Sequence, residues 1–287
     1  MTSGSERLRE AAAVMKGPGA SGSRAAALGR VLVVEDGVVN RKVAVELLSR
    51  AGCESDVAVD GEEAVTATAR TAYDLVLMDC QMPRLDGYEA TRAIRARESA
   101  SGSRRVPIVA LTAQAVHDDR ERCLAAGMDD YLSKPIRAAA LREILDRWLL
   151  APSEPAPAGP RASGANEPDM DAEVLAELRE LGGTAGPEVL AEILTTFLRE
   201  GEQRLAVLRS ALDSENWHDL GRAAHALKGA SATVGARGLS SSCARLEREV
   251  EGPVAPGPRP AEWRALVDEI VAAFARARPH LEALRGA

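Results

Sequence analysis

Short apolar runs alternate with stretches of helical periodicity through the first half of the chain. The runs are predicted as strands at residues 30–35, 53–59, 74–79, 106–111 and 130–133. Apolar runs of this length, bounded by turn residues, are typical of strands buried on both faces of a parallel sheet. The intervening stretches are predicted as helices at residues 38–50, 62–71, 86–97, 116–126 and 135–149. This alternation predicts a doubly wound α/β domain with a five-stranded parallel sheet over residues 30–150.

The second half has no strand pattern, and its apolar residues recur at helical spacing. A short helix is predicted to stop at Gly182-Gly183, and a long helix is predicted to start at Pro187. Three more follow over residues 217–234, 239–250 and 262–284, the last with a kink or break at Pro279. We expect a separate all-α domain over residues 169–287, an antiparallel four-helix bundle with a short leading helix.

Two segments are expected to lie outside these domains. Residues 1–29 are rich in Ala, Gly and Ser and offer little to bury, so they are predicted to form a disordered leader. Residues 151–168 are rich in Pro, Ala and Gly and are predicted to be a semi-extended linker.

Charge and composition exclude several classes of protein. A net charge of −7 and an aromatic content of 3% argue against a protein that binds nucleic acid directly. No stretch approaches the ~18 apolar residues of a membrane span, and the N-terminus lacks a secretory pattern. The four cysteines show no paired or metal-ligand spacing, which indicates reduced thiols. We therefore expect a cytoplasmic protein without direct membrane contact.

Carboxylates gather where the predicted strands end. Asp79 ends the apolar run 75–78, and Glu35 and Asp36 follow an earlier run. Adjacent strands lie about 5 Å apart, so these carboxylates would crowd one another unless a cation lay among them. Mg²⁺ prefers such oxygen ligands, and we predict that Asp36 and Asp79 hold it.

Two further polar residues follow later strands at the same edge, Thr112 and Lys134. A carboxylate can attack phosphorus and form an aspartyl phosphate, and the transfer needs mainly positioning and charge neutralisation. The hydroxyl of Thr112 and the ammonium of Lys134 could each serve a phosphoryl oxygen. The chain has only four lysines among 36 basic residues, so a retained Lys marks a place for a compact charge.

The first domain closely resembles the receiver domain of two-component response regulators. The resemblance rests on Val-Glu-Asp at 34–36, Asp-Cys-Gln-Met-Pro-Arg-Leu-Asp-Gly at 79–87, Ala-Leu-Thr-Ala at 110–113 and Ala-Gly-Met-Asp-Asp-Tyr-Leu-Ser-Lys-Pro at 126–135. It implies a flavodoxin-like sheet with strand order 2-1-3-4-5 and phosphorylation of Asp79. Gly37 departs from the family, which often has a polar side chain there, and this departure could alter the rate of dephosphorylation.

The same resemblance implies roles for further residues. Mg²⁺ would be bound by Asp36, Asp79 and the backbone carbonyl of Gln81, with Glu35 assisting. Thr112 would move to the phosphoryl group while Tyr131 turns inward, which is the family's switch. Lys134-Pro135 would be a cis peptide.

The second domain contains His225, Lys228 and Gly229 on one helical face. An imidazole nitrogen can attack phosphorus, Lys228 could balance the charge, and a glycine inside a helix suggests close approach of another molecule. With Trp217, Ser231, Gly235-Ala236, Cys243 and Leu246-Glu247, the segment resembles the histidine phosphotransfer (HPt) domain. That resemblance implies that His225 is the phospho-acceptor.

Together the residues predict a phosphorelay protein without a kinase domain, similar to the C-terminal part of hybrid sensor kinases. Its expected partners are an upstream histidine kinase and a downstream response regulator or HPt protein. An alternative is a pair of domains that mainly dock partners. A phosphatase with an Asp nucleophile is disfavoured, because Gln81 stands where such enzymes place a second acid. Asp129-Asp130 and the histidines His117, His218 and His280 are interpreted as solvated surface residues.

Overall fold

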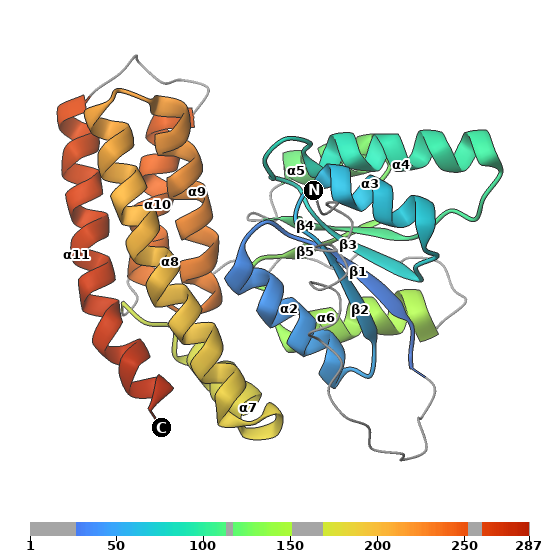
Figure 1. The fold of residues 1–287 in the computed structure, drawn as a ribbon, viewed down its shortest axis with the longest axis horizontal. Helices are drawn as coiled ribbons and strands as arrows, with labels where there is room; N and C mark the ends of the chain where they lie inside the picture. The colour runs from blue at the N-terminus through green and yellow to red at the C-terminus, as the bar shows by residue number, and fades with distance from the viewer. Residues whose placement is uncertain (1–26, 113–116, 151–168, 252–259, 287) are drawn as a thin grey trace, which may run out of the picture.

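The computed structural model describes residues 27–112, 117–150, 169–251 and 260–286 (Figure 1). Most of the predicted leader and all of the predicted linker lie outside the described residues. An α/β part precedes a part made only of helices, and the two lie side by side in Figure 1.

The α/β part is built on a five-stranded parallel sheet with the order β2-β1-β3-β4-β5, which confirms the predicted fold class. Its strands are β1 (Arg30–Val34), β2 (Glu54–Ala58), β3 (Leu75–Asp79), β4 (Ile108–Thr112) and β5 (Asp130–Ser133). Every residue of β3 and β4 is buried, as expected for inner strands of a parallel sheet, whereas the edge strands β2 and β5 are partly exposed.

Helices cover both faces of this sheet (Figure 1). One face packs against α2 (Val38–Arg50) and α6 (Ala138–Leu145), which continues as a π-helical turn, η1 (Asp146–Leu150). The other face packs against α3 (Gly61–Arg70), α4 (Gly87–Ser101) and α5 (His117–Ala126). Alternate residues of β1 point to opposite faces, so Val31 and Val33 face α2 while Leu32 and Val34 join the opposite core.

The helical part consists of α7 (Ala172–Ala185), α8 (Pro187–Asp213), α9 (Trp217–Thr233), α10 (Arg237–Glu251) and α11 (Pro260–Arg285). The last four form a bundle, and α7 packs against α8. Aromatic pairs fill the bundle core, with Phe197 and Phe274 at 6.0 Å and Trp217 and Trp263 at 5.0 Å between ring centroids. Within the described ranges, no helix is both long and apolar enough to cross a membrane.

One predicted helix end is wrong. The first helix of the helical part does not stop at Gly182-Gly183 but runs to Ala185. A Cβ at Gly182 would lie 3.1 Å from the Cβ of Leu190, so this glycine lets α7 approach α8 closely instead of ending the helix. The sequence predicted a kink or a break at Pro279, and the break is absent, because α11 continues through the proline to Arg285. Buried residues on both sides of the proline, among them Ala277 and Leu281, hold the helix against the bundle.

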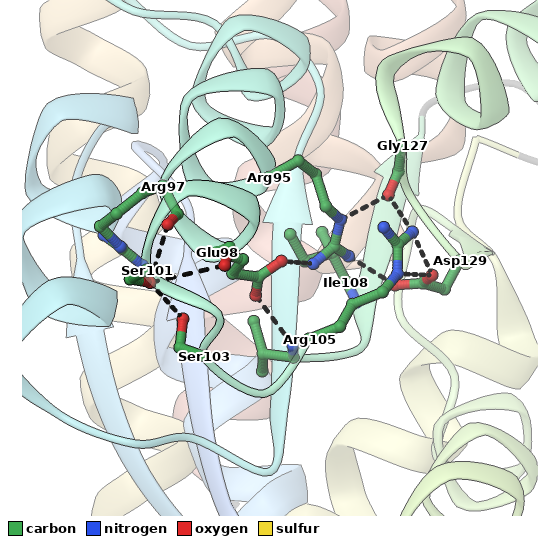
Figure 2. A network of polar contacts seen from close by, with 10 residues as sticks. Arg95, Arg97, Glu98, Ser101, Ser103, Arg105, Ile108, Gly127 and Asp129 are labelled. Atoms are coloured by element: carbon green, nitrogen blue, oxygen red, sulfur yellow. Dashed lines mark hydrogen bonds and ion pairs between the residues drawn. The ribbon is translucent and has the colours of Figure 1, made fainter.

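The interpretation of Asp129 and Asp130 as solvated surface charges is also wrong. The Asp129 carboxylate accepts hydrogen bonds from Arg95 at 2.7 Å, Arg105 at 2.8 Å and the backbone N–H of Ile108 at 2.8 Å (Figure 2). Arg95 also pairs with Glu98 of its own helix, at 2.6 Å. Asp130 accepts hydrogen bonds from Trp148 and Arg147. Both carboxylates are mostly buried and tie loops and helices to the sheet.

The bundle packs against α2 of the α/β part through α8 and α9 (Figure 1). Lys42 on α2 contacts Glu192 on α8 at 2.5 Å and the hydroxyl of Thr196 at 3.2 Å. The guanidinium of Arg50 donates to the backbone carbonyls of Glu180 and Leu181 on α7. These contacts orient one face of the bundle towards the carboxyl edge of the sheet.

Candidate functional site

Strand register sets the predicted receiver residues in a row at the carboxyl edge of the sheet. Val34 pairs with Met78, so Glu35 follows beside Asp79. Asp79 in turn pairs with Leu111, which precedes Thr112. Thr112 pairs with Ser133, and the backbone N–H of Lys134 donates to the Thr112 carbonyl at 2.7 Å. The sheet therefore brings together residues that are widely separated in the sequence.

Lys134 is the cation at the centre of this row. Its Nζ lies 2.6 Å from Oδ2 of Asp79 and 2.7 Å from Oε2 of Glu35. Burial alone would lower the pKa of Lys134, but the two carboxylates outweigh it and raise the pKa above its usual value. The ammonium is therefore charged at neutral pH. The peptide bond between Lys134 and Pro135 is cis, as the receiver resemblance implies.

Three carboxylates approach one another beside Lys134. Oxygen atoms of Glu35, Asp36 and Asp79 all lie within 4.8 Å of one another. Burial and the charge of Glu35 raise the pKa of Asp79 to about 7 against the opposing effect of Lys134. Burial, followed by Glu35, also raises the pKa of Asp36. The three carboxylates repel one another when ionised, and a cation among them would relieve this repulsion. Their oxygen atoms are the ligands that a divalent cation such as Mg²⁺ prefers.

The loop after β3 holds Asp79 in place. The backbone N–H of Gln81 donates to Oδ1 of Asp79 at 3.2 Å. A Cβ at Gly87 would lie only 2.0 Å from the carbonyl oxygen of Asp79, so only glycine allows α4 to begin this close to the strand end. Asp86 caps the same helix by accepting from the backbone N–H of Glu89.

The two predicted switch residues lie on neighbouring strands. Thr112 is buried at the end of β4. Tyr131 on β5 is half-buried and packs against the hydrophobic cluster on the α3–α5 face.

The predicted phosphotransfer residues lie on α9 and share one carboxylate of α10. Nδ1 of His225 lies 2.6 Å from Oε1 of Glu247, and Nζ of Lys228 lies 2.6 Å from Oε2 of the same residue. Burial would raise the pKa of Glu247, but hydrogen bonds from His225 and Lys228 outweigh it, so the pKa falls below its usual value. An ionised Glu247 accepts a hydrogen bond from Nδ1–H of His225, and in this tautomer the free lone pair of the ring lies on Nε2.

The two sets of residues line a single cavity of about 1010 Å³ between the α/β part and the bundle. Asp79, Asp36 and Lys134 line it from the sheet, and His225 and Lys228 line it from α9. The other predicted site residues that line it are Glu35, Gln81, Thr112 and Gly229. A Cβ at Gly229 would lie 3.3 Å from Nδ2 of Asn40 on α2, so this glycine is at the point of close approach between the two parts.

Sequence reasoning missed three residues of this site. Glu247 was noted only as part of a motif, although an acidic residue on the strongly amphipathic α10 could have suggested a partner for the basic residues of α9. Arg204 on α8 lines the cavity, and its positive charge acts to lower the pKa of Asp36. Asn40 on α2 contacts both Glu35 and the bundle. Contacts between domains leave no periodic signal in a sequence.

Comparison with protein families matches the two parts separately. Residues 31–146 match the response regulator receiver domain, and residues 192–276 match the Hpt domain. The sensor protein GacS of Pseudomonas syringae pv. syringae is 38% identical over 220 residues, which are 76% of this chain and 24% of that protein. The virulence sensor protein BvgS of Bordetella pertussis is 32% identical over 232 residues, 80% of this chain and 19% of that protein. The chain thus spans a quarter or less of the length of these relatives.

Solved structures match part of the chain. A receiver domain of a Pseudomonas aeruginosa sensor histidine kinase, with a magnesium ion in its active-site cleft, is 49% identical, with a TM-score of 0.39 over 43% of this chain and 98% of that chain. A Saccharomyces cerevisiae co-crystal pairs a histidine phosphotransfer protein with the receiver domain of its downstream response regulator. It gives 35% identity and a TM-score of 0.41, and the match covers 42% of this chain and 88% of the matched chain.

Proposed function

Because the chain carries a receiver domain followed by an Hpt domain, as in the C-terminal region of the sensor kinases GacS and BvgS, we propose that it relays phosphoryl groups between Asp79 and His225. The observation that carries this proposal is the single cavity lined by both residues. An upstream histidine kinase supplies the phosphoryl group to Asp79, and a downstream response regulator or HPt protein receives it from His225.

Transfer between the two residues exchanges one bond for another. The lone pair on Nε2 of His225 attacks phosphorus, the N–P bond forms, and the P–O bond to Asp79 breaks with its electron pair left on the carboxylate. The proton on Nδ1 stays in the hydrogen bond with Glu247, whose negative charge offsets the imidazolium that forms. The reverse reaction uses the same atoms, so the site supports flow in either direction.

The surrounding residues neutralise the phosphoryl oxygens. The ammonium of Lys134 reaches Asp79 directly and serves one oxygen, and the hydroxyl of Thr112 serves another. Mg²⁺, held by Asp36, Asp79 and the backbone carbonyl of Gln81 with Glu35 assisting, would neutralise further negative charge when bound. Movement of Thr112 towards the phosphoryl group, with Tyr131 turning inward, would report phosphorylation to partners on the face formed by α5, β5 and α6.

The proposal is tested by labelling the full chain with a small acyl phosphate. We expect Mg²⁺-dependent label on Asp79, followed by label on His225. Asp79→Asn should abolish both labels, whereas His225→Gln should abolish only the second. The two phosphoryl groups differ in chemistry, since an acyl phosphate is labile to base and a phosphohistidine is stable to it. Label that reaches His225 in Asp79→Asn, or never reaches it in the unmodified chain, would contradict the proposed relay.

A further inference from the structure

One side-chain amide links the carboxylate cluster of the receiver domain to the phosphotransfer helix. Nδ2 of Asn40 donates to Oε1 of Glu35 at 2.9 Å. At its other end, Oδ1 of Asn40 accepts a hydrogen bond from the hydroxyl of Thr233 on α9 at 2.7 Å. All three residues are buried, with 1% of Glu35, 9% of Asn40 and 6% of Thr233 exposed. The link therefore runs through the protein interior and is not exchanged for water in the docked state.

Chemistry fixes the orientation of this amide. The Glu35 carboxylate only accepts hydrogen bonds when ionised, so the NH₂ group of Asn40 must face it. The amide oxygen then faces Thr233, which can donate. Glu35 in turn pairs with Lys134 through its other oxygen. Rotation of the Asn40 amide would place two acceptors together, so the Glu35 carboxylate and Thr233 select the same rotamer.

The bundle side of the link can be released without leaving a buried group unpaired. The Thr233 hydroxyl lies 3.1 Å from the carbonyl of Gly229, one turn earlier in α9. When α9 leaves the receiver domain, the hydroxyl can donate to that carbonyl, an ordinary arrangement for Thr in a helix. For Asn40, the hydrogen bond from Thr233 is the contact that holds its amide oxygen, so undocking removes the group that fixes the amide. Undocking thus frees the amide that makes the shorter of two hydrogen bonds to Oε1 of Glu35, the other being from the backbone N–H of Gly37 at 3.3 Å.

We propose that Asn40 is a positioning residue that couples docking of the Hpt domain to cation binding at Glu35, Asp36 and Asp79. Docking through Thr233 holds Asn40, Asn40 holds Glu35, and the cluster is thereby arranged for Mg²⁺ before the cation arrives. The inference rests on the proposed relay, because it assigns the docked state as the one in which transfer between Asp79 and His225 takes place. Coupling of this kind is reciprocal, so Mg²⁺ must favour docking by the same factor.

The experiment measures Mg²⁺ affinity of the full chain by calorimetry, with no phosphoryl donor present. Thr233→Val removes the hydroxyl while keeping the shape, and should weaken Mg²⁺ binding by about threefold to tenfold, the effect of one buried hydrogen bond. Asn40→Ala should weaken it at least as much. Ser231→Ala is the matched control, because its hydroxyl bonds within α9 to the carbonyl of Leu227. The control should bind Mg²⁺ like the unmodified chain.

A double-mutant cycle isolates the route through Asn40. In the Asn40→Ala background, Thr233→Val should have no further effect on Mg²⁺ affinity. Amide exchange provides a second readout, since saturating Mg²⁺ should slow exchange in α2 and the end of α9 in the unmodified chain and less so in Thr233→Val. An unchanged Mg²⁺ affinity in Thr233→Val, or an effect that persists in the Asn40→Ala background, would overturn the inference. Phosphoryl transfer is assayed separately, so a chain that relays phosphate but shows no coupling refutes this inference alone.

Discussion

At the scale of single residues, Glu247 serves two basic side chains with one carboxylate. One oxygen accepts from Nδ1 of His225 and the other from Lys228. It therefore fixes both the imidazole ring and the ammonium that faces the cavity. A residue that orients the nucleophile without touching phosphorus acts on the rate through geometry and tautomer.

We expect Glu247→Ala to slow transfer from Asp79 to His225 by about tenfold to a hundredfold, because a charge-assisted hydrogen bond is lost. Glu247→Gln should be slowed less than Glu247→Ala, since an amide oxygen still accepts from Nδ1–H although the negative charge is lost. Single-turnover transfer in the full chain measures both effects, and phosphorylation of Asp79 by an acyl phosphate serves as the control. Equal rates for Ala and Gln variants would show that the hydrogen bond to Nδ1 is unimportant.

The same carboxylate predicts a pH dependence of stability. Because the pKa of Glu247 is lower in the folded protein than its ordinary value of about 4.5, ionisation stabilises the fold above that value. The contribution is lost as the pH falls through the folded-state pKa. We expect the difference in free energy of unfolding between the unmodified chain and Glu247→Gln to be largest at neutral pH and to shrink in acid. Urea unfolding monitored by bundle tryptophan fluorescence measures it, and a difference that grows in acid would contradict the assignment.

At the scale of elements, Gly229 sets how closely α9 approaches α2. A Cβ at this position would lie 3.3 Å from Nδ2 of Asn40, which is already a tight contact for alanine, so a larger side chain must separate the helices. We expect Gly229→Leu to slow transfer to His225 by about a hundredfold, the cost of a displacement near 1 Å. Asp79 should still accept phosphate from a small donor. Gly183→Leu is the control on another helix, because nothing lies within 4 Å of a Cβ at Gly183.

A second element-scale prediction concerns the network around Asp129 (Figure 2). Asp129→Ala leaves Arg95 and the backbone N–H of Ile108 without their partner in a mostly buried site, which we expect to cost about 3 kcal/mol of receiver stability. Arg105→Ala should cost less than about 1 kcal/mol, because that side chain is 55% exposed. Chemical unfolding monitored by circular dichroism compares the two variants. An equal loss of stability in the two variants would show that the buried contacts of Asp129 with Arg95 and Ile108 contribute nothing to stability.

Elements with strong periodicity were predictable, and their contacts were not. The apolar runs and the helical spacing between them predicted a parallel sheet, and hence the row of Glu35, Asp79, Thr112 and Lys134, because parallel strands end at one edge. The strand order came from the resemblance to receiver domains. The predicted helix end at Gly182-Gly183 was wrong, because a glycine that ends a helix and a glycine that lets a neighbouring helix approach look alike in a sequence. Asp129 was misread because its partners lie on α4 and in the turn before β4.

At the scale of the whole molecule, the bundle lies across a cavity from the sheet edge that carries Asp79. The contacts of α2 with α8 and α9 are both apolar and polar. Val43 of α2 belongs to the same buried hydrophobic cluster as Ile193 of α8, and the ion pair between Lys42 and Glu192, whose side chains are 31% and 68% exposed, adds little. For a partner to reach Asp79 along this face, the two parts must separate. An upstream donor and the chain's own Hpt domain would then occupy the same face in turn.

Docking within one chain makes transfer between Asp79 and His225 an intramolecular step. Its rate should be independent of protein concentration, because tethered domains meet at effective concentrations on the order of millimolar. Following label from Asp79 to His225 over a range of chain concentrations measures this directly. A mixture of His225→Gln as donor and Asp79→Asn as acceptor can transfer only between chains, so its rate should rise with concentration and remain far below the intramolecular rate at micromolar protein. If the unmodified chain shows the same proportional rise as the mixture, transfer takes place between molecules. The docked arrangement would then be one that blocks outside partners instead of one that relays phosphate.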